Sequence, residues 1–454
     1  MRKWLLASFI GILAQAIYSA DLQTVYDDAL KNDPELAAAV AQNKINRTGL
    51  PIAVSTVLPQ VNFSAGRGEN EFERRTDGPS FPGFEGFSDG RSENESWSVS
   101  VSQTLFDAGA FITILSARVR LDAANQTLVA AEQNLIIRTA QAYMNVLRGQ
   151  DLLESSLAAE EAVERQLEQA QQRFDVGLVA ITDVLNTTAA YDNAKVSTID
   201  AKQNQGIFFE SLGTITGVKY EQINRLSEEL PITEPFPEDE EAWVQQALST
   251  NPNLIVAEKN VAAAKHDRRR VWTTYAPVLR ASGSKSFSRD PLSFLGEETE
   301  SQSINLNLSI PIFQGGRNIL EHRTAALTVE QSKHNLRLQR LTVARDTRNL
   351  YRAVVTDVIR VNAKQKAIES NQAALEATQT GYEVGTRNVV DVLLAQQQLY
   401  GAIFDYADSR YNYVLNGLRL KLSAGALSGA DIESLNQFTT PDNPVTQILS
   451  LTGR

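Results

Sequence analysis

Two long stretches of this 454-residue chain contain no proline, and they limit what the chain can fold into. One lies between Pro82 and Pro231, and the other lies between Pro311 and Pro441. Proline breaks the interior of a helix because it lacks an amide hydrogen and its ring collides with the preceding turn. The two gaps are therefore the places where long helices can form.

The span 107–174 contains few glycines and repeats apolar residues at intervals of three and four, the spacing of a helix packed along one side. As one α-helix it would be about 100 Å long. The pattern returns over 316–380, and shorter helices are predicted over 182–216 and 389–423. Many interior-type positions hold Ala, Thr, Ser or Gln, which suits helices packed side by side in a curved wall. A plain coiled-coil rod has the same periodicity, but the strands interleaved with these helices exclude it.

Strand hairpins are predicted ahead of both long helices, at about 60–106 and 278–313. Residues 96–106 alternate between apolar side chains and serine or threonine, and 303–312 alternate between Ile or Leu and Ser or Asn. The loops inside the hairpins, roughly 72–91 and 290–300, are rich in Gly, Pro, Ser and acidic residues, as exposed loops are. One interpretation of this pattern is an ordinary half-buried sheet of a soluble protein.

The other interpretation is a sheet that crosses a membrane. The strands are about as long as the 9–11 residues that span a bilayer, and their small, uncharged polar face suits a wet lumen. Four strands cannot close a membrane barrel, because the smallest barrels have eight and an open sheet edge in lipid is prohibitively costly. If these strands cross a membrane, several subunits must therefore share one barrel.

The two halves of the chain contain similar segments. ALKNDPEL at 29–36 returns as ALSTNPNL at 247–254, and each places a capping side chain, Asp33 or Asn251, before a proline at a helix start. We interpret the chain as one module written twice. The predicted division is a leader at 1–20, a first repeat at 21–217 with long helices at about 107–217, a linker at 218–241, a second repeat at 242–425 with long helices at about 314–424, and a C-terminal segment and tail at 426–454.

Composition and charge narrow the function classes. Arg2 and Lys3 followed by an apolar stretch predict a secretory leader, cleaved after Ala20 or Ala16, and no later run approaches the ~20 apolar residues of a membrane helix. The formal charge of −11 argues against a nucleic-acid partner. Cysteine is absent and the three histidines are scattered, so no metal site is predicted. No grouping of Ser, His and Asp supports an enzyme, and no motif indicates a cofactor.

Two similar segments mark the ends of the long helices: RFDVGLVAITDVLN at 173–186 and GYEVGTRNVVDVLL at 381–394. At a shift of 208 they share Val-Gly and Asp-Val-Leu, with glycine where a helix C-terminus favours a left-handed residue. We interpret both as helix-to-helix turns at the same end of an elongated molecule. Tyr382 and Arg387 occur in the second turn only, since their counterparts are Phe174 and Val179. A residue present in one half alone is not a requirement of the shared turn.

The chain resembles the TolC family of outer-membrane efflux proteins over nearly its whole length after the leader. The resemblance rests on AYMNVL (142–147), RQLEQAQQRFDVGLVAITDVLN (165–186), PIFQGG (311–316), GYEVGTRNVVDVL (381–393) and SRYNYVLN (409–416). It implies a homotrimer in the outer membrane of a Gram-negative bacterium, in contact with outer-membrane lipid. Each protomer would give four strands to a transmembrane β-barrel, which an α-helical barrel continues across the periplasm. The inter-repeat and C-terminal segments would form a small mixed equatorial domain.

The function implied by the resemblance is an exit duct for efflux pumps and type I secretion. Its implied partners are a periplasmic adaptor protein and an inner-membrane transporter. The alternative is a soluble periplasmic coiled-coil scaffold or adaptor, whose strands would not be in lipid.

The resemblance also implies a gate at the periplasmic helix tips. Tyr382 and Arg387 match residues that hold the inner helix pair, and Thr182 and Asp183 match their partners on the outer pair. Charge-assisted bonds such as Arg387 to Asp183 contribute about 1–3 kcal/mol each, enough to hold a gate and weak enough to release it.

A pore constriction and a docking surface are implied at the same tips. Asp391 matches the first aspartate of a ring that narrows the pore, whereas Leu394 replaces the second carboxylate of the family pattern. For Asp183 and Asp391 the alternative is helix capping, because each lies near a helix start. The expected docking points for the adaptor are Gly177, Leu178, Gly385 and Thr386.

Overall fold

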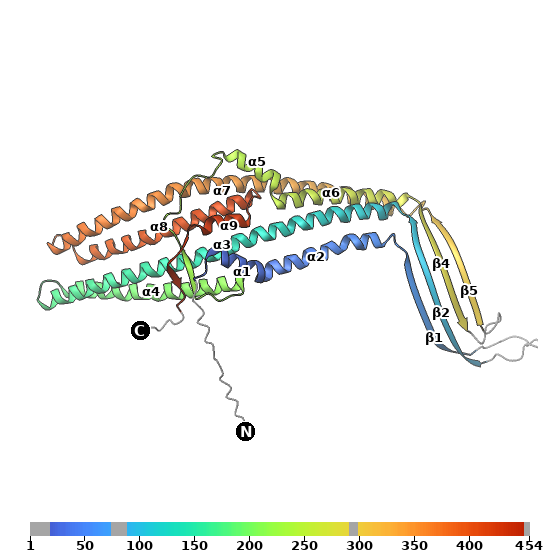
Figure 1. Ribbon diagram of the computed structural model, residues 1–454, viewed down its shortest axis with the longest axis horizontal. Helices are drawn as coiled ribbons and strands as arrows, with labels where there is room; N and C mark the ends of the chain where they lie inside the picture. The colour runs from blue at the N-terminus through green and yellow to red at the C-terminus, as the bar shows by residue number, and fades with distance from the viewer. Residues whose placement is uncertain (1–18, 74–88, 290–297, 449–454) are drawn as a thin grey trace, which may run out of the picture. The chain divides into compact units, whose positions relative to one another are not determined.

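The computed structural model describes residues 19–73, 89–289 and 298–448, and Figure 1 labels its elements. The predicted leader, 1–20, lies outside the described residues except for its last two positions. The helices are α1 (Leu22–Asn32), α2 (Pro34–Ser55), α3 (Ala108–Asp175), α4 (Ile181–Thr216), α5 (Glu240–Thr250), α6 (Pro252–Trp272), α7 (Arg317–Glu383), α8 (Val389–Ser423) and α9 (Gly429–Asn436). The strands are β1 (Gln60–Glu73), β2 (Asp89–Phe106), β3 (Gln222–Leu226), β4 (Val278–Arg289), β5 (Glu298–Ser309) and β6 (Thr439–Thr446).

The two gaps between prolines hold the long helices. α3 has 68 residues and α7 has 67, and each is followed after a short turn by a shorter helix that packs on it. The hydroxyl of Thr198 in α4 donates to the carbonyl of Ser156 in α3 at 3.3 Å. The amide of Asn416 in α8 donates to the Asp357 carboxylate in α7 at 2.7 Å. Among the described helices, none combines the length and the apolar composition that crossing a bilayer requires.

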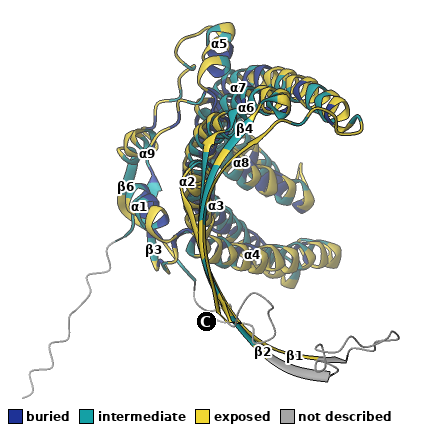
Figure 2. Ribbon diagram, turned by 90° about the vertical axis from the view of Figure 1, so that its right-hand side faces the viewer, coloured by how far each residue is buried: buried dark blue, intermediate teal, exposed yellow. Residues whose placement is uncertain are grey.

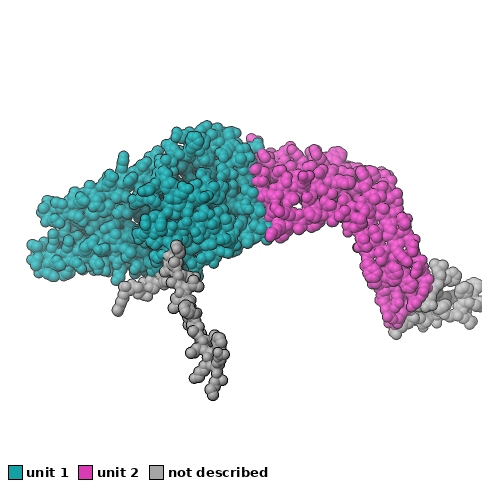
Figure 3. All heavy atoms as spheres, viewed as in Figure 1, with its two compact units in different colours: residues 1–41, 127–254, 339–454 teal, residues 42–126, 255–338 magenta. Residues whose placement is uncertain are grey.

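The chain divides into two compact units, shown in two colours in Figure 3. Unit 1 comprises residues 1–41, 127–254 and 339–454, and unit 2 comprises residues 42–126 and 255–338. The four-stranded sheet lies in unit 2. Both helix-to-helix turns and the pair of strands β3 and β6 lie in unit 1.

The sheet of unit 2 has the strand order β1-β2-β4-β5, and every neighbouring pair is antiparallel. Its central pairing joins β2 of the first half to β4 of the second half. Trp97 and Phe287 lie opposite each other in that pairing, and their rings stack with centroids 6.4 Å apart. β1 and β5 are left as the two edges of the sheet.

The two faces of this sheet differ in chemistry across all four strands. Residues paired across an antiparallel ladder lie on the same face, so the register assigns each side chain to one face. The apolar face carries Val61, Phe63, Trp97, Val99, Val101, Leu279, Phe287, Ile304, Leu306 and Leu308. Lys285 and Glu300 lie on this face too and form an ion pair at 3.8 Å. The serine face carries Ser64, Ser98, Ser100, Ser102, Ser282, Ser284, Ser286, Ser303, Asn305 and Asn307, together with Arg280. Figure 2 shows exposed and half-buried residues along the strands, and Ile304 on the apolar face is 94% exposed.

The strands extend further into the hairpin loops than predicted. β1 reaches Glu73 and pairs it with Asp89, inside the loop predicted at 72–91, and β5 already begins at Glu298. Hairpin pairing satisfies backbone donors and acceptors whatever the side chains are, so charged residues continue the ladder. β5 also ends at Ser309, earlier than the predicted 312. The centres of both loops lie outside the described residues.

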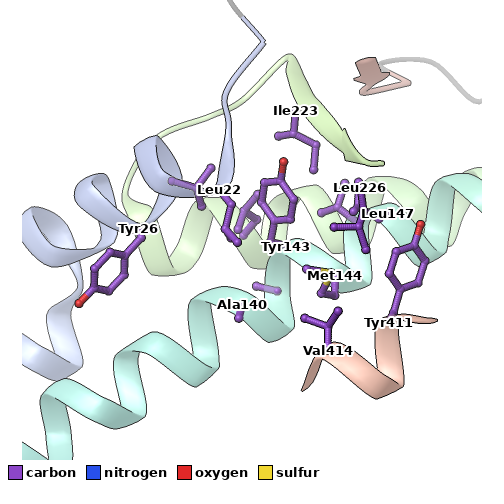
Figure 4. Packing of buried hydrophobic residues seen from close by; sticks show 14 of the residues in the cluster. Leu22, Tyr26, Ala140, Tyr143, Met144, Leu147, Ile223, Leu226, Tyr411 and Val414 are labelled. Atoms are coloured by element: carbon purple, nitrogen blue, oxygen red, sulfur yellow. The ribbon is translucent and has the colours of Figure 1, made fainter. Parts of the chain in front are cut away.

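Unit 1 is built around a core that collects segments far apart in the sequence (Figure 4). Tyr143 of α3 is fully buried, and its hydroxyl donates to the carbonyl of Asn224 in β3 at 2.6 Å. Leu22 of α1, Ile223 of β3 and Val414 of α8 belong to the same cluster. Burial of each large apolar side chain contributes about 1.5–3 kcal/mol, so this core holds α1 and the small sheet against the long helices.

β3 and β6 lie in the predicted linker and C-terminal segments, for which the resemblance implied a small mixed domain but no strand bounds were predicted. They pair antiparallel, which brings residues 222–226 and 439–446 together in one small sheet. β6 contains Pro441 and Pro444, and because proline is unusual inside a strand the sequence does not predict a strand there. The two prolines are tolerated because β6 is an edge strand, whereas β3 also bridges Ala20 on its other side.

The two Asx-Pro segments form matching helix starts. The Asp33 carboxylate accepts the amide of Leu36 at 2.8 Å, and the Asn251 side chain accepts the amide of Leu254 at 3.1 Å. Asp33 alone also pairs with a guanidinium, that of Arg138, at 2.6 Å. Burial raises the pKa of Asp33, but the hydrogen bonds from Arg138 and the Leu36 amide outweigh it, so the pKa lies below its ordinary value.

We expect Asp33→Ala to lower the free energy of unfolding by about 2 kcal/mol, because it removes a cap and leaves Arg138 with only the exposed carboxylate of Glu35, which lies 2.9 Å from its Nη1 atom. Asn251→Ala is the matched control and should cost about 1 kcal/mol, since it removes a cap without a charge. Urea unfolding followed by circular dichroism in detergent measures both. Because the Asp33 pKa is lowered, the charge contribution is present at neutral pH and is lost as the pH falls through that lowered value. Equal losses for the two variants would contradict the charge contribution.

Candidate functional site at the helix tips

The two turns that end the long helices share one backbone geometry. Gly177, between α3 and α4, has a φ of 79°, and Gly385, between α7 and α8, has a φ of 80°. The amide of Leu178 donates to the carbonyl of Arg173 at 2.8 Å, and the amide of Thr386 donates to the carbonyl of Gly381 at 2.8 Å. No heavy atom lies within 4 Å of a Cβ added at either turn glycine, so the left-handed conformation alone requires glycine there.

The predicted docking residues lie at the surface of these turns. Leu178 is 75% exposed, and Gly177, Gly385 and Thr386 are exposed as well. Val384, the neighbour of Gly385, is 69% exposed. Each tip therefore presents apolar side chains beside its turn glycine.

The helices that follow the two turns start differently. Asn388 and Asp391 form a reciprocal capping box at the start of α8, with the Asp391 amide 2.9 Å from the Asn388 side-chain oxygen. α4 starts after Ala180, which has no capping side chain. The capping interpretation therefore describes Asp391, whereas the Asp183 carboxylate accepts no hydrogen bond from any residue that the structure describes.

Arg387 lies across the end of α7. A Cβ added at Gly381 would come within 2.8 Å of the Arg387 Cγ, so the glycine leaves room for this side chain. The Arg387 Nη1 atom is 4.0 Å from an Asp391 carboxylate oxygen, and the Arg387 side chain is 62% exposed. Within the described part of one protomer, Arg387 pairs with Asp391 and not with Asp183.

Tyr382 is 8% exposed and belongs to an apolar cluster between α7 and α8 with Leu375, Val389 and Val392. Its hydroxyl has no hydrogen-bond partner among the described residues. The Arg173 guanidinium carbon, from the last turn of α3, lies 4.7 Å from the centre of the Tyr382 ring. Sequence reasoning did not select Arg173, because residues 209 positions apart carry no joint local signal.

A cavity of about 270 Å³ lies beside Tyr382, bounded by α3, α7 and α8. Gln166 of α3 and Gln396 of α8 also line it, and both are more than nine-tenths buried. The Gln166 Nε2 and Gln396 Oε1 atoms have no partner among the described residues, like the Tyr382 hydroxyl. Three buried polar atoms thus remain unsatisfied around one space, each at a cost of about 1–3 kcal/mol. Glutamine is ordinary in a helix, so the sequence holds no signal for this cluster.

The other predicted residues do not form a joint site among the described residues. Thr182 is exposed in the first turn of α4, and the Asp391 side chain is 35% exposed. Leu394, which stands where the family pattern has a second carboxylate, is 51% exposed. Among the described residues, no cluster of His, Asp and Glu has the composition of a metal site.

Comparison with known proteins also divides the chain into two halves. The model of the family described as outer membrane efflux protein matches residues 25–218 and 243–426. The chain is 30% identical over 431 residues to outer membrane protein TolC of Vibrio cholerae, covering 94% of this chain and 95% of that relative. It is 26% identical over 439 residues to the alkaline protease secretion protein AprF of Pseudomonas aeruginosa, covering 95% and 90%.

The fold is also that of a solved outer-membrane protein. The crystal structure of the outer membrane protein VceC from Vibrio cholerae superposes with a TM-score of 0.73 at 17% identity, covering 89% of this chain and 96% of that one. The family match covers both long-helix turns and the full four-stranded sheet. The chain belongs to the TolC family of outer membrane efflux proteins.

Proposed function

We propose that this protein is a passive exit duct in the outer membrane of a Gram-negative bacterium, through which small molecules or polypeptides leave the cell. The observation that carries the proposal is the 30% identity to an outer membrane TolC protein over 94% of the chain. The similarity to a protease secretion protein supports polypeptides as one class of cargo.

The sheet supplies the membrane-crossing part of the proposed duct. Its apolar face is exposed, with Ile304 at 94%, Leu306 at 66% and Phe63 at 69%, as side chains that contact lipid would be. Its serine face is polar, with serine and asparagine side chains and a charged residue, Arg280, which suits a water-filled lumen. Because β1 and β5 are open edges, three protomers would pair edge to edge and close one shared barrel.

The long helices supply the part that crosses the periplasm. A helix of 68 residues is about 100 Å long, and three protomers would place twelve long and shorter helices around one duct. β3 and β6 would form the small mixed domain around its middle.

The helix tips supply the gate. Asp183 carries a carboxylate without a partner, and Arg387 has only a 4.0 Å contact with Asp391. In the proposed trimer, Arg387 and Tyr382 of one tip would bond to Thr182 and Asp183 of another tip and keep the duct closed. Asp391 would face the axis in three copies and favour cations there, while it also caps α8.

The exposed turns are the proposed contact for other proteins of an export machine. Leu178 and Val384 offer apolar side chains beside glycines that allow close backbone approach. A periplasmic adaptor would dock at Gly177, Leu178, Gly385 and Thr386 and connect the duct to an inner-membrane transporter.

The assembly is tested first by fractionation. We expect the full chain to be extracted from the outer membrane only with detergent, and to run as a trimer in size-exclusion chromatography with light scattering. A monomer recovered from the periplasmic fraction without detergent would instead indicate a soluble scaffold.

Leu306→Arg tests the lipid-facing assignment of the apolar face. We expect it to reduce insertion by about 2–4 kcal/mol, because a charge would enter the hydrocarbon. Asn305→Arg is the matched control, since it places the same charge one residue away on the serine face. The measurement is the fraction of protein inserted into vesicles as urea is diluted. Equal effects of the two variants would contradict the assignment of the faces.

Arg387→Ser and Tyr382→Leu test the gate. Each is expected to raise single-channel conductance in planar bilayers, because a lost bond of about 1–2 kcal/mol shifts closed tips toward open ones by about tenfold. Arg360→Ser is the control, since Arg360 also lies on α7 but pairs with Asp357 of its own helix. The gate assignment fails if both variants conduct like the unmodified protein.

A further inference from the structure

The contact between Arg173 and Tyr382 joins the two helical pairs within one protomer. Arg173 lies in the last turn of α3, and Tyr382 lies in the last turn of α7. The guanidinium carbon is 4.7 Å from the ring centre, inside the ~6 Å range in which a cation is attracted by an aromatic face. The contact bridges the tip of α3–α4 to the tip of α7–α8.

Arg173 is half-buried and has no ion pair with any described residue. Two other half-buried arginines of unit 1 pair with carboxylates, Arg138 with Asp33 and Arg148 with Asp408. A guanidinium removed from water needs some compensation, and the face of an aromatic ring provides it. The Tyr382 ring is therefore the compensating partner of Arg173.

Tyr382 is held by its ring and not by its hydroxyl. The ring packs in the α7–α8 cluster with Leu375 and Val392, while the hydroxyl has no partner in the described protomer. The Arg173 guanidinium lies over the face of this ring. Within one protomer, the connection from Tyr382 to α3 thus runs through the π face.

The two repeats divide this contact between them. At the shift of 208, Arg173 corresponds to Gly381, and Tyr382 corresponds to Phe174. The first tip supplies the cation and the second supplies the buried ring, so the contact is not a feature of the shared turn. Gly381 also leaves room for the Arg387 side chain. The difference between arginine at 173 and glycine at 381 therefore matters for the contacts of both Arg173 and Arg387.

We propose that Arg173 is a positioning residue of the gate, which holds the α7–α8 tip against α3 of the same protomer by stacking on the Tyr382 ring. The proposal rests on the proposed gate and adds a closing link that does not use the Tyr382 hydroxyl. Opening the tip would require the ring to leave the guanidinium.

The test separates the ring of Tyr382 from its hydroxyl. Arg173→Gln removes the cation at similar length, Tyr382→Phe keeps the ring, and Tyr382→Leu removes it. We expect Arg173→Gln to raise the open probability in planar bilayers by about two- to fivefold, and Tyr382→Phe to open the channel less than Tyr382→Leu does. In a double-mutant cycle, Arg173→Gln should act fully in the Tyr382→Phe background and add nothing in the Tyr382→Leu background.

Arg165→Gln is the matched control, because Arg165 lies on the same helix but pairs with Glu161. Each variant is first shown to form the same oligomer in detergent as the unmodified protein. The proposal is overturned if Arg173→Gln has the same effect on the open probability in the Tyr382→Leu background, where the ring is absent. It is also overturned if Arg173→Gln leaves the open probability unchanged while Arg387→Ser raises it. If Arg173→Gln opens the channel and Arg387→Ser does not, the stacking link stands and the role of Arg387 in the proposed gate fails.

Discussion

The pairing of backbone groups at the edges of the sheet is the constraint on which the rest of the molecule depends. β2 and β4 satisfy each other in the centre, but β1 and β5 each leave one row of amides and carbonyls without a neighbour. The same sheet exposes an apolar face across all four strands. Open strand edges and an exposed apolar face both favour a partner that excludes water. In the proposed assembly, two further protomers and the surrounding lipid are those partners.

The helix tips show the same incompleteness at a smaller scale. The Asp183 carboxylate, the Tyr382 hydroxyl, and the amides of Gln166 and Gln396 lack full partners in the described protomer. Buried polar atoms are seldom left unpaired in a stable structure, and in the proposed trimer a neighbouring tip would supply partners for Tyr382 and Asp183. Hydrogen bonds between protomers would suit the proposed gate, because they break when one protomer moves relative to another. The stacking of Arg173 on Tyr382 belongs instead to one protomer.

Several residues show which structural features could be predicted from the sequence. Asp33 and Asn251 were expected to cap helices, and both accept the amide three residues on. α8 has the predicted bounds, because Asn388 caps its start and Gly425, with a φ of 64°, follows its end. The bounds of β3 and β6 were not predicted, since a five-residue strand and a strand with two prolines become strands only by pairing with each other. Asp391 had two interpretations, and the capping box shows that the cap is formed whatever else the carboxylate does.

By itself, the sequence determined the long helices, their turns, the alternating strands and the family. Each of these depends on residues close together in the chain, where the period of the side chains and the positions of proline and glycine act directly. Only the tertiary structure decided which strands meet, which side chains share a face of the sheet, and that Arg173 lies on the ring of Tyr382. Those features join residues up to 209 positions apart, and their stability comes from packing that no local pattern encodes.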